Sequence, residues 1–246
     1  MLFRFAYEAG LIDRPIRFGP QFKEPSRKTL RISRNQNGKR MFEADELRAI
    51  LDVATQPLKA MIMLGINCGF GQSDIANLPN SAVDLDKRWI DYPRPKTSVE
   101  RHVPLWPETL VSLGEAIARR PDPNNAADSE CVFITKYGNR WVRTTDHDEP
   151  EKRIPLDSVA PAFAKVKALL DINGKRNFYA IRHTFATIAG ESEDQVAVNA
   201  IIGHVDNTKA GVYRERISDE RLRAVTDVVR RWLFDSDAKE LASNGY

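Results

Sequence analysis

Cysteine is scarce in this chain of 246 residues, and long apolar runs are missing from it. The two cysteines, Cys68 and Cys131, are too few for a disulfide framework or a cysteine-rich metal site, and we interpret them as buried residues of a protein in a reducing compartment. No apolar stretch approaches the roughly 18–20 residues that a membrane-spanning helix needs. Charges interrupt the first eight residues too early for a signal peptide, so we expect a cytoplasmic protein without a membrane partner.

A large net charge is also missing, because 37 Lys and Arg residues face 34 Asp and Glu residues and leave a net charge of only +3. The total conceals an asymmetry. Residues 1–40 hold ten basic and three acidic residues, whereas residues 41–246 hold 27 and 31. Such a basic segment indicates a nucleic-acid-binding arm, although charge alone leaves a merely solvated arm as the alternative.

The apolar periodicity predicts a mainly α chain with a small antiparallel β-sheet. The expected helices cover residues 44–54, 58–68, 107–117, 158–170, 178–189, 193–202 and 219–234. Short strands are expected at residues 88–92, 101–105 and 131–134, and the first two flank a hairpin tip at 93–98. A polar loop is expected at 136–153; its acidic cluster at 146–149 could bind a metal, but such loops are usually only solvated, so no metal site is predicted.

The N-terminal part of the chain has a different character. Residues 1–10 are predicted to be the end of a helix that begins upstream of them, with Gly10 as the stop. Residues 13–40 contain three prolines and no sustained period, which predicts a basic linker.

Three short segments in the last third carry the residues best suited to chemistry. They are residues 178–187 (FYAIRHTFAT), 201–204 (IIGH) and 211–215 (GVYRE). Arg182 precedes His204 by 22 residues, and Tyr213 follows His204 by nine. In order, spacing and flanking residues, this arrangement resembles the catalytic domain of the tyrosine recombinases, the phage-integrase family.

The resemblance extends over about residues 41–234. Residues 42–47 are similar to the opening helix of the family's catalytic domain, and Lys96 stands where the family has a lysine in a β-hairpin. Residues 5–13 resemble the last helix of the family's N-terminal core-binding domain. The resemblance therefore implies the remainder of that domain with a linker at 1–40, an integrase-like catalytic domain at 41–236 and a tail at 237–246.

The resemblance implies transesterification on double-stranded DNA without a cofactor or metal. Tyr213 would attack a backbone phosphate and form a 3′-phosphotyrosine bond. Arg182 would bind the non-bridging oxygens, His204 would donate a hydrogen bond to the same phosphate, and Lys96 would protonate the leaving 5′-oxygen.

The resemblance also implies partners and a place in the cell. The basic linker would follow the DNA backbone, and family members assemble into a synaptic tetramer on DNA, which implies a homo-oligomer at the nucleoid. The expected DNA contacts from the linker are Arg27, Lys28, Arg31, Arg34, Lys39 and Arg40.

The chain departs from the family pattern at two phosphate-binding positions. The first arginine of the family is replaced by Gly71, and the usual His or Lys three residues before Arg182 is Tyr179. Losing one transition-state donor typically costs about 10²–10³ in rate. Gln72 and Tyr179 could act as neutral donors in a slower enzyme. A cation from elsewhere could also fill the gap, and the candidates are Arg94, Arg101 and Arg48.

The sequence thus predicts a DNA-binding, site-specific recombinase or integrase-like protein of a mobile element, with a degenerate active site. A non-catalytic DNA-binding remnant or accessory protein of a mobile element is the alternative. A type IB topoisomerase-like enzyme shares the chemistry, but its usual accessory elements are not visible in the sequence.

Overall fold

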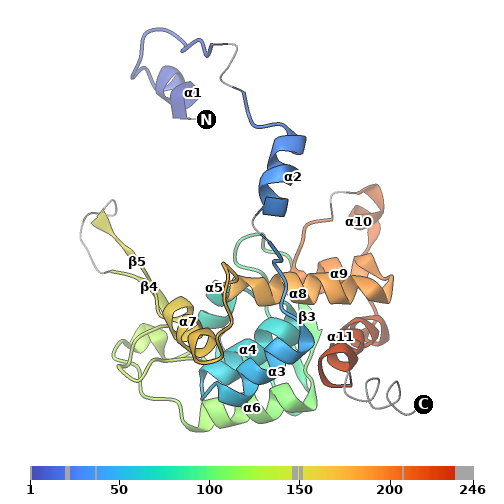
Figure 1. The fold of residues 1–246 in the computed structure, drawn as a ribbon. Helices are drawn as coiled ribbons and strands as arrows, with labels where there is room; N and C mark the ends of the chain where they lie inside the picture. The colour runs from blue at the N-terminus through green and yellow to red at the C-terminus, as the bar shows by residue number, and fades with distance from the viewer. Residues whose placement is uncertain are drawn as a thin grey trace. The chain divides into compact units, whose positions relative to one another are not determined.

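The computed structural model describes residues 2–19, 23–36, 38–145, 149, 152–206 and 208–235. The chain divides into two compact units, Met1–Gly38 and Lys39–Tyr246, and each is described by itself (Figure 1). Within the described residues, no helix is both long and apolar enough to cross a membrane.

The first unit contains two helices, α1 (Leu2–Glu8) and α2 (Arg27–Gln36). The predicted helix with Gly10 as its stop is confirmed, with Gly10 at a φ of +69° after α1, while its start upstream of these residues stays a prediction. Helix α2 was missed, because residues 13–40 were expected to be irregular. It forms because Ser26 caps it, accepting a 3.1 Å hydrogen bond from the Thr29 amide, and because proline is absent from Ser26 to Gln36.

The core of the second unit is built around α4 (Leu58–Cys68), in which every residue except Lys59 is buried. Helix α4 contacts α6 (Pro107–Ala118) and α8 (Tyr179–Ala189), and Figure 1 shows it between them. Further helices complete the shell: α3 (Ala44–Val53), α7 (Val159–Leu169), α9 (Gln195–Ile202) and α11 (Asp219–Phe234). The mainly α fold expected from the sequence is therefore confirmed.

A three-stranded antiparallel sheet has the order β1 (Val83–Asp84), β2 (Trp89–Asp91) and β3 (His102–Pro104). Ile90 pairs with Val103, so the hairpin expected between the second and third strands is confirmed. Strand β3 also contacts α9 and α11. The hairpin is thereby held beside the C-terminal helices.

Two sequence expectations about strands were wrong. Residues 131–134 form only isolated bridges, Cys131 with Pro79 and Ile134 with Arg140, because their neighbours are loops rather than a strand. Residues 136–153 are not all loop, since β4 (Val142–Thr144) pairs with β5 (Pro155–Asp157). The side chains of β4 are mostly exposed, so the strand leaves no apolar pattern in the sequence.

Short helices connect the larger elements. They are α5 (Gln72–Ala76), η1 (Asn80–Ala82), η2 (Ala126–Asp128), η4 (Gly190–Ser192) and α10 (Lys209–Tyr213).

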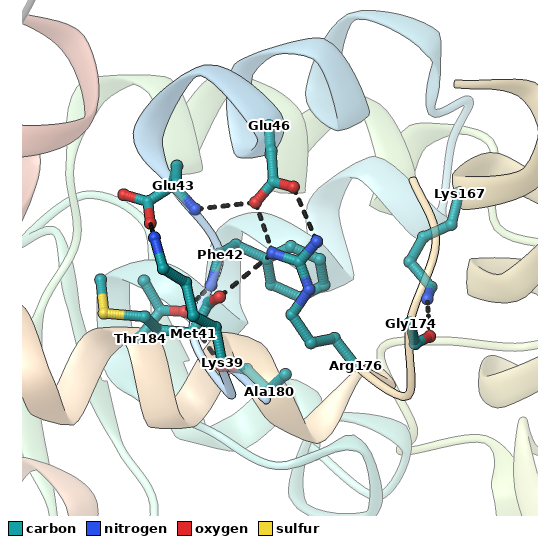
Figure 2. Close-up of polar contacts among 10 residues, drawn as sticks. All are labelled: Lys39, Met41, Phe42, Glu43, Glu46, Lys167, Gly174, Arg176, Ala180 and Thr184. Carbon is teal, nitrogen blue, oxygen red and sulfur yellow. Dashed lines mark hydrogen bonds and ion pairs between the residues drawn. The ribbon is translucent and has the colours of Figure 1, made fainter. Parts of the chain in front are cut away.

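The start of the second unit is fastened to α8, as Figure 2 shows. The Phe42 amide donates to Thr184 Oγ1 at 2.8 Å, and Arg176, which precedes α8, donates to Glu46 on α3 at 2.7 Å. The Arg176 guanidinium also lies over the Phe42 ring, 4.7 Å from its centre. Because Thr184 is two residues from Arg182, these contacts fix the helix turn that carries the candidate phosphate-binding arginine.

Candidate functional site

Arg182 projects from α8 into a buried position where only 4 % of its surface is exposed. Its Nη1 donates to the Gly69 carbonyl at 2.6 Å, and its Nη2 donates to the Ile202 carbonyl at 2.7 Å. Both acceptors stand at the C-terminal ends of helices, α4 and α9, where the helix dipole is negative. Burial, and next the neighbouring Arg94, lower the pKa of Arg182, which nevertheless stays a cation at neutral pH.

Gly69 makes the close approach of α4 and α8 possible. Its φ is +63°, and a Cβ placed on it would lie 2.6 Å from the Phe185 ring and 2.8 Å from Ile202. The left-handed conformation ends α4 and turns the Gly69 carbonyl toward Arg182.

His204 directly follows a helix end that, like the end of α4, is closed by a glycine in the left-handed conformation. Gly203 has a φ of +65° and terminates α9, and the His204 amide donates to the Asn199 carbonyl at 2.8 Å. Desolvation, and then the cations Arg182 and Arg94, lower the pKa of His204 from 6.5. The imidazole is therefore neutral at pH 7 and keeps one N–H to donate beside Arg182.

The β2–β3 hairpin reaches the same place. Arg94 Nη1 and Thr97 Oγ1 both donate to the Gly203 carbonyl, at 3.2 Å and 3.1 Å. Lys96 lies between them in the turn with its side chain exposed. The structure thus brings Arg182, His204 and the Lys96 turn together at the C-terminal end of α9.

A second buried arginine, Arg101, supports the β2–β3 hairpin from its buried side. Arg101 on the hairpin donates its Nε to the Tyr92 carbonyl at 2.8 Å and pairs through Nη1 with Asp74 at 3.0 Å. Its guanidinium stacks 4.1 Å from the centre of the Phe70 ring. These partners join the hairpin to α5, which begins one residue after Gly71.

Gly71 and Tyr179, where the chain departs from the family pattern, and the possible substitute donor Gln72 make contacts with other parts of the protein. Gln72 donates to Asp157, whose other oxygen accepts the backbone amides that begin α7. The ring of Tyr179 covers Gly71, and a Cβ on that glycine would lie 3.5 Å from it. Tyr179 also packs edge-on against His183. The Gln72 side chain is therefore hydrogen-bonded to Asp157, and the Tyr179 ring fills the space over Gly71.

Tyr213 is not packed against these groups. It ends α10 and has 85 % of its surface exposed. A cavity of about 720 Å³ lies between the hairpin, α9 and the segment that carries Tyr213. Its lining includes Glu100, His102, Asn199, His204, Asp206 and Arg214.

Asp206 shapes the segment that carries Tyr213, and the sequence patterns did not indicate it. Its carboxylate accepts hydrogen bonds from the Thr208 hydroxyl at 2.6 Å and from Arg214 at 2.8 Å, which lower its pKa to about 2. Thr208 in turn caps α10 by accepting from the Gly211 amide. The Asp-x-Thr spacing directly before a helix was the available signal. Thr97 gave no such signal, and Arg94 was one of three cations left open, because their partner Gly203 is more than 100 residues away.

The expected DNA contacts fall in both units. Arg27, Lys28 and Arg31 are exposed on α2, and the side chain of Arg34 lies outside the described residues. Lys39 and Arg40 are exposed in the second unit, where Lys39 pairs with Glu43 at 3.0 Å. Three residues of the acidic cluster, 146–148, also lie outside the described residues. Within the described part, no group of three or more potential metal ligands comes together.

The model of the phage integrase family matches residues 40–220, and the chain belongs to this family. Solved structures share its fold. The XerA recombinase is 21 % identical over 74 % of this chain, with a TM-score of 0.53. A lambda integrase dimer bound to a core site is 17 % identical over 88 % (TM-score 0.53), and the Tn1549 transposon integrase with a circular intermediate DNA is 17 % identical over 92 % (TM-score 0.54).

The chain is shorter than these proteins. Its match spans 62 % of the XerA recombinase, 71 % of the lambda integrase chain and 74 % of the Tn1549 integrase chain. No curated protein matches the chain significantly.

Proposed function

We propose that this protein cuts and rejoins double-stranded DNA at specific sites through a covalent bond between Tyr213 and a 3′-phosphate. The observation that carries the proposal is the convergence of Arg182, His204 and the Lys96 turn at the end of α9. A buried arginine without a carboxylate partner among the described residues, next to a neutral histidine N–H, is suited to a DNA backbone phosphate, whose single negative charge grows to two in the transition state.

The proposed step balances without an outside reactant. Tyr213 releases its phenolic proton to water as its oxygen attacks the phosphorus, and the bond from phosphorus to the 5′-oxygen breaks. Lys96 gives a proton to the departing 5′-oxygen, while Arg182 and His204 bind the non-bridging oxygens, whose negative charge grows in the transition state. Attack by a 5′-hydroxyl on the phosphotyrosine reverses the step and rejoins a strand.

The exposure of Tyr213 adds a requirement to this mechanism. Its phenol has to approach a phosphate held at Arg182, and the cavity beside His204 leaves room for the segment that carries it. We infer that a second copy of the chain on the same DNA belongs to the working assembly, in line with the synaptic tetramer that the family resemblance implies. We further propose that the protein acts at the nucleoid, because its proposed substrate is DNA.

A second candidate function is DNA binding without cutting. It is favoured by Gly71, which carries no side chain, and by Gln72 and Tyr179, which are engaged with Asp157 and His183. Such a protein would serve a mobile element as an accessory factor.

Covalent trapping separates the two functions. The protein is incubated with a library of nicked duplexes of randomised sequence, from which the cut strand cannot be rejoined, and adducts are resolved on a denaturing gel. We expect an adduct with the wild type and none with Tyr213→Phe. Tyr137→Phe is the matched control, because Tyr137 is also exposed (69 %) but lies outside the site. Salt-sensitive binding without any adduct would refute the enzyme and leave the accessory factor.

A further inference from the structure

We propose that Arg94 is the second arginine of the phosphate site and supplies the charge that Gly71 cannot. This inference rests on the proposed function, because it names a further group that binds the reacting phosphate. The sequence left three cations open for the role, and the geometry distinguishes them.

Arg94 and Arg182 converge on neighbouring carbonyls although they are far apart in the chain. Arg182 donates to the Ile202 carbonyl at 2.7 Å, and Arg94 donates to the next one, Gly203, at 3.2 Å. His204 follows directly. Two guanidinium groups and an imidazole N–H are thus gathered at the end of one helix, α9.

Gly203 permits this approach. A Cβ placed on it would lie 2.9 Å from both Cβ and Cδ of Arg94, so the aliphatic part of Arg94 rests directly on the glycine backbone. Any larger residue at 203 would push Arg94 away from Arg182. The glycine is therefore required for the convergence as well as for the end of α9.

The charge of this pair is not compensated by protein carboxylates. Within the described part of the chain, no Asp or Glu forms an ion pair with Arg94 or Arg182; nearby Asp74 is bound by Arg101. Two like charges repel when they are held side by side, and Arg94 is the leading charged neighbour that lowers the pKa of Arg182. A bound DNA phosphate, and still more its doubly negative transition state, would relieve this repulsion, since a guanidinium keeps several N–H groups free after donating to one carbonyl.

The other two cations do not fit the role. The Arg101 side chain is fully buried, with its Nε on the Tyr92 carbonyl and its Nη1 on Asp74. Its Nη2 has no hydrogen-bond partner in the described part of the chain but is closed off from the surface, and the charge is already paired with Asp74, so Arg101 supports the hairpin from inside. Arg48 donates to the Leu233 carbonyl at 2.6 Å and pairs with Asp45, which places it where α3 meets the end of α11. Arg94 alone among the three is half-buried beside both Arg182 and His204.

The assignment gives the hairpin two separate tasks. Arg94 would bind a non-bridging oxygen, while Lys96, two residues further on, protonates the leaving oxygen. Both are fixed by Thr97, whose hydroxyl donates to the same Gly203 carbonyl as Arg94. Movement of the hairpin would therefore weaken phosphate binding and proton transfer together.

A sulfur substitution in the DNA separates these two tasks. The probe is a randomised duplex library in which the 5′-oxygen at one position is replaced by sulfur, so that Tyr213 displaces a thiolate that needs no proton. On this substrate we expect the defect of Lys96→Ala to be relieved. We expect Arg94→Ala and Arg94→Gln to remain about 10² slower than the wild type in adduct formation, and Arg94→Lys to recover part of the rate.

Arg119→Ala is the matched control, because Arg119 is an exposed cation at the end of α6, outside the site. Wild-type rates in both Arg94→Ala and Arg119→Ala, together with loss of the adduct in Tyr213→Phe, would overturn the role of Arg94 and leave the proposed function intact. Absence of any adduct with the wild type would refute the proposed function instead.

If the wild type forms no adduct, binding of inorganic phosphate tests the role of Arg94 instead. Phosphate is titrated into the full chain and followed by the NMR signals of the His204 ring, assigned with His204→Gln. We expect Arg94→Ala to weaken phosphate binding at least about tenfold and to raise the pKa of His204 toward 6.5 in the absence of phosphate. An unchanged phosphate affinity and an unchanged pKa of His204 would overturn the inference independently of catalysis.

Discussion

Arg182 combines a structural and a chemical task at one position. Its guanidinium closes the ends of α4 and α9 by donating to the carbonyls of Gly69 and Ile202. Its remaining N–H groups are available to a phosphate. Removal of the side chain therefore affects folding and phosphate binding at the same time, and only a quantitative comparison separates the two effects.

We expect Arg182→Ala to lower the free energy of unfolding by about 2–6 kcal/mol, because two buried carbonyls lose their donor at about 1–3 kcal/mol each. Urea unfolding measures this loss. Arg119→Ala, at an exposed position, should stay within about 0.5 kcal/mol of the wild type. Equal stability of the two variants would show that the Arg182 hydrogen bonds contribute nothing to the fold.

His204 gives the site a dependence on pH whose sign follows from its neighbours. Desolvation and the cations Arg182 and Arg94 favour the neutral ring, so its pKa lies below 6.5 in the free protein. A bound phosphate favours the protonated ring and raises that pKa. Binding therefore takes up a proton, and we expect DNA affinity to increase as the pH falls from 7 to 6. Fluorescence anisotropy on His204→Gln should show a weaker increase; the same increase in both proteins would contradict this assignment.

At the scale of elements, α10 depends on a single close approach of two backbone segments. A Cβ on Gly211 would lie 2.7 Å from the Asp206 carbonyl oxygen, so α10, which ends at Tyr213, needs a glycine at this position. Asp206, Thr208 and Arg214 then hold the segment by their hydrogen bonds. The orientation of Tyr213 is thus determined locally, apart from the core.

We expect Gly211→Ala to reduce adduct formation at least about tenfold while the melting temperature changes little, because the described residues of α10 lie outside the buried core. Hydrogen exchange should increase at the backbone amides of α10. Gly114→Ala is the control: a Cβ there meets nothing within 4 Å in the middle of α6, so this variant should gain about 0.4–1 kcal/mol in stability. Wild-type activity of Gly211→Ala would show that α10 tolerates the displacement.

Figure 2 shows the hydrogen bonds by which the start of the second unit and α3 are joined to α8 and to Arg176, which precedes it. Arg176 holds Glu46 on α3, and its hydrogen bond is the main reason that the pKa of Glu46 is lowered from 4.5. A lowered carboxylate pKa stabilises the fold above about pH 4.5, and this contribution disappears as the pH falls through the pKa of the folded state. The ion pair between Arg176 and Glu46 is therefore intact at every pH at which DNA chemistry would be measured.

At the scale of the whole molecule, the buried apolar core of the described residues lies in the second unit, whereas the N-terminal segment is rich in basic residues. Every buried apolar residue of the described core comes from residue 42 or later, whereas residues 1–40 carry ten of the 37 basic residues. The N-terminal segment contributes charge rather than core. Its removal should therefore leave the second unit folded.

We expect deletion of residues 1–38 to leave the melting temperature unchanged and to weaken DNA binding. The slope of log affinity against log salt should become less steep by about 0.9 for each phosphate that the arm no longer neutralises. Deletion of residues 1–18 is the control, because it retains the seven basic residues from Lys23 to Arg40. Equal salt slopes for the wild type and both deletions would show that the arm does not touch DNA.

The sequence predicted the features that depend on local patterns. The spacing of Arg182 and His204 indicated the family, and the apolar periods predicted the large helices with little error. The contacts of Arg94 with Gly203 and of Gln72 with Asp157 join residues 109 and 85 positions apart, and no local pattern encodes such pairs. Helix α2 was missed because it is strongly polar and basic and follows a proline-containing segment, and the β4–β5 hairpin was missed because the side chains of β4 are mostly exposed.

The burial of both cysteines has a practical consequence. Cys68 is fully buried and Cys131 is 5 % exposed, and burial raises the pKa of both thiols, so neither reacts readily with maleimide dyes in the folded protein. A cysteine introduced by Lys136→Cys would then be the single labelled site on the native chain. A fluorophore at that position, paired with one on DNA, would report in real time how the second unit approaches and leaves its binding site.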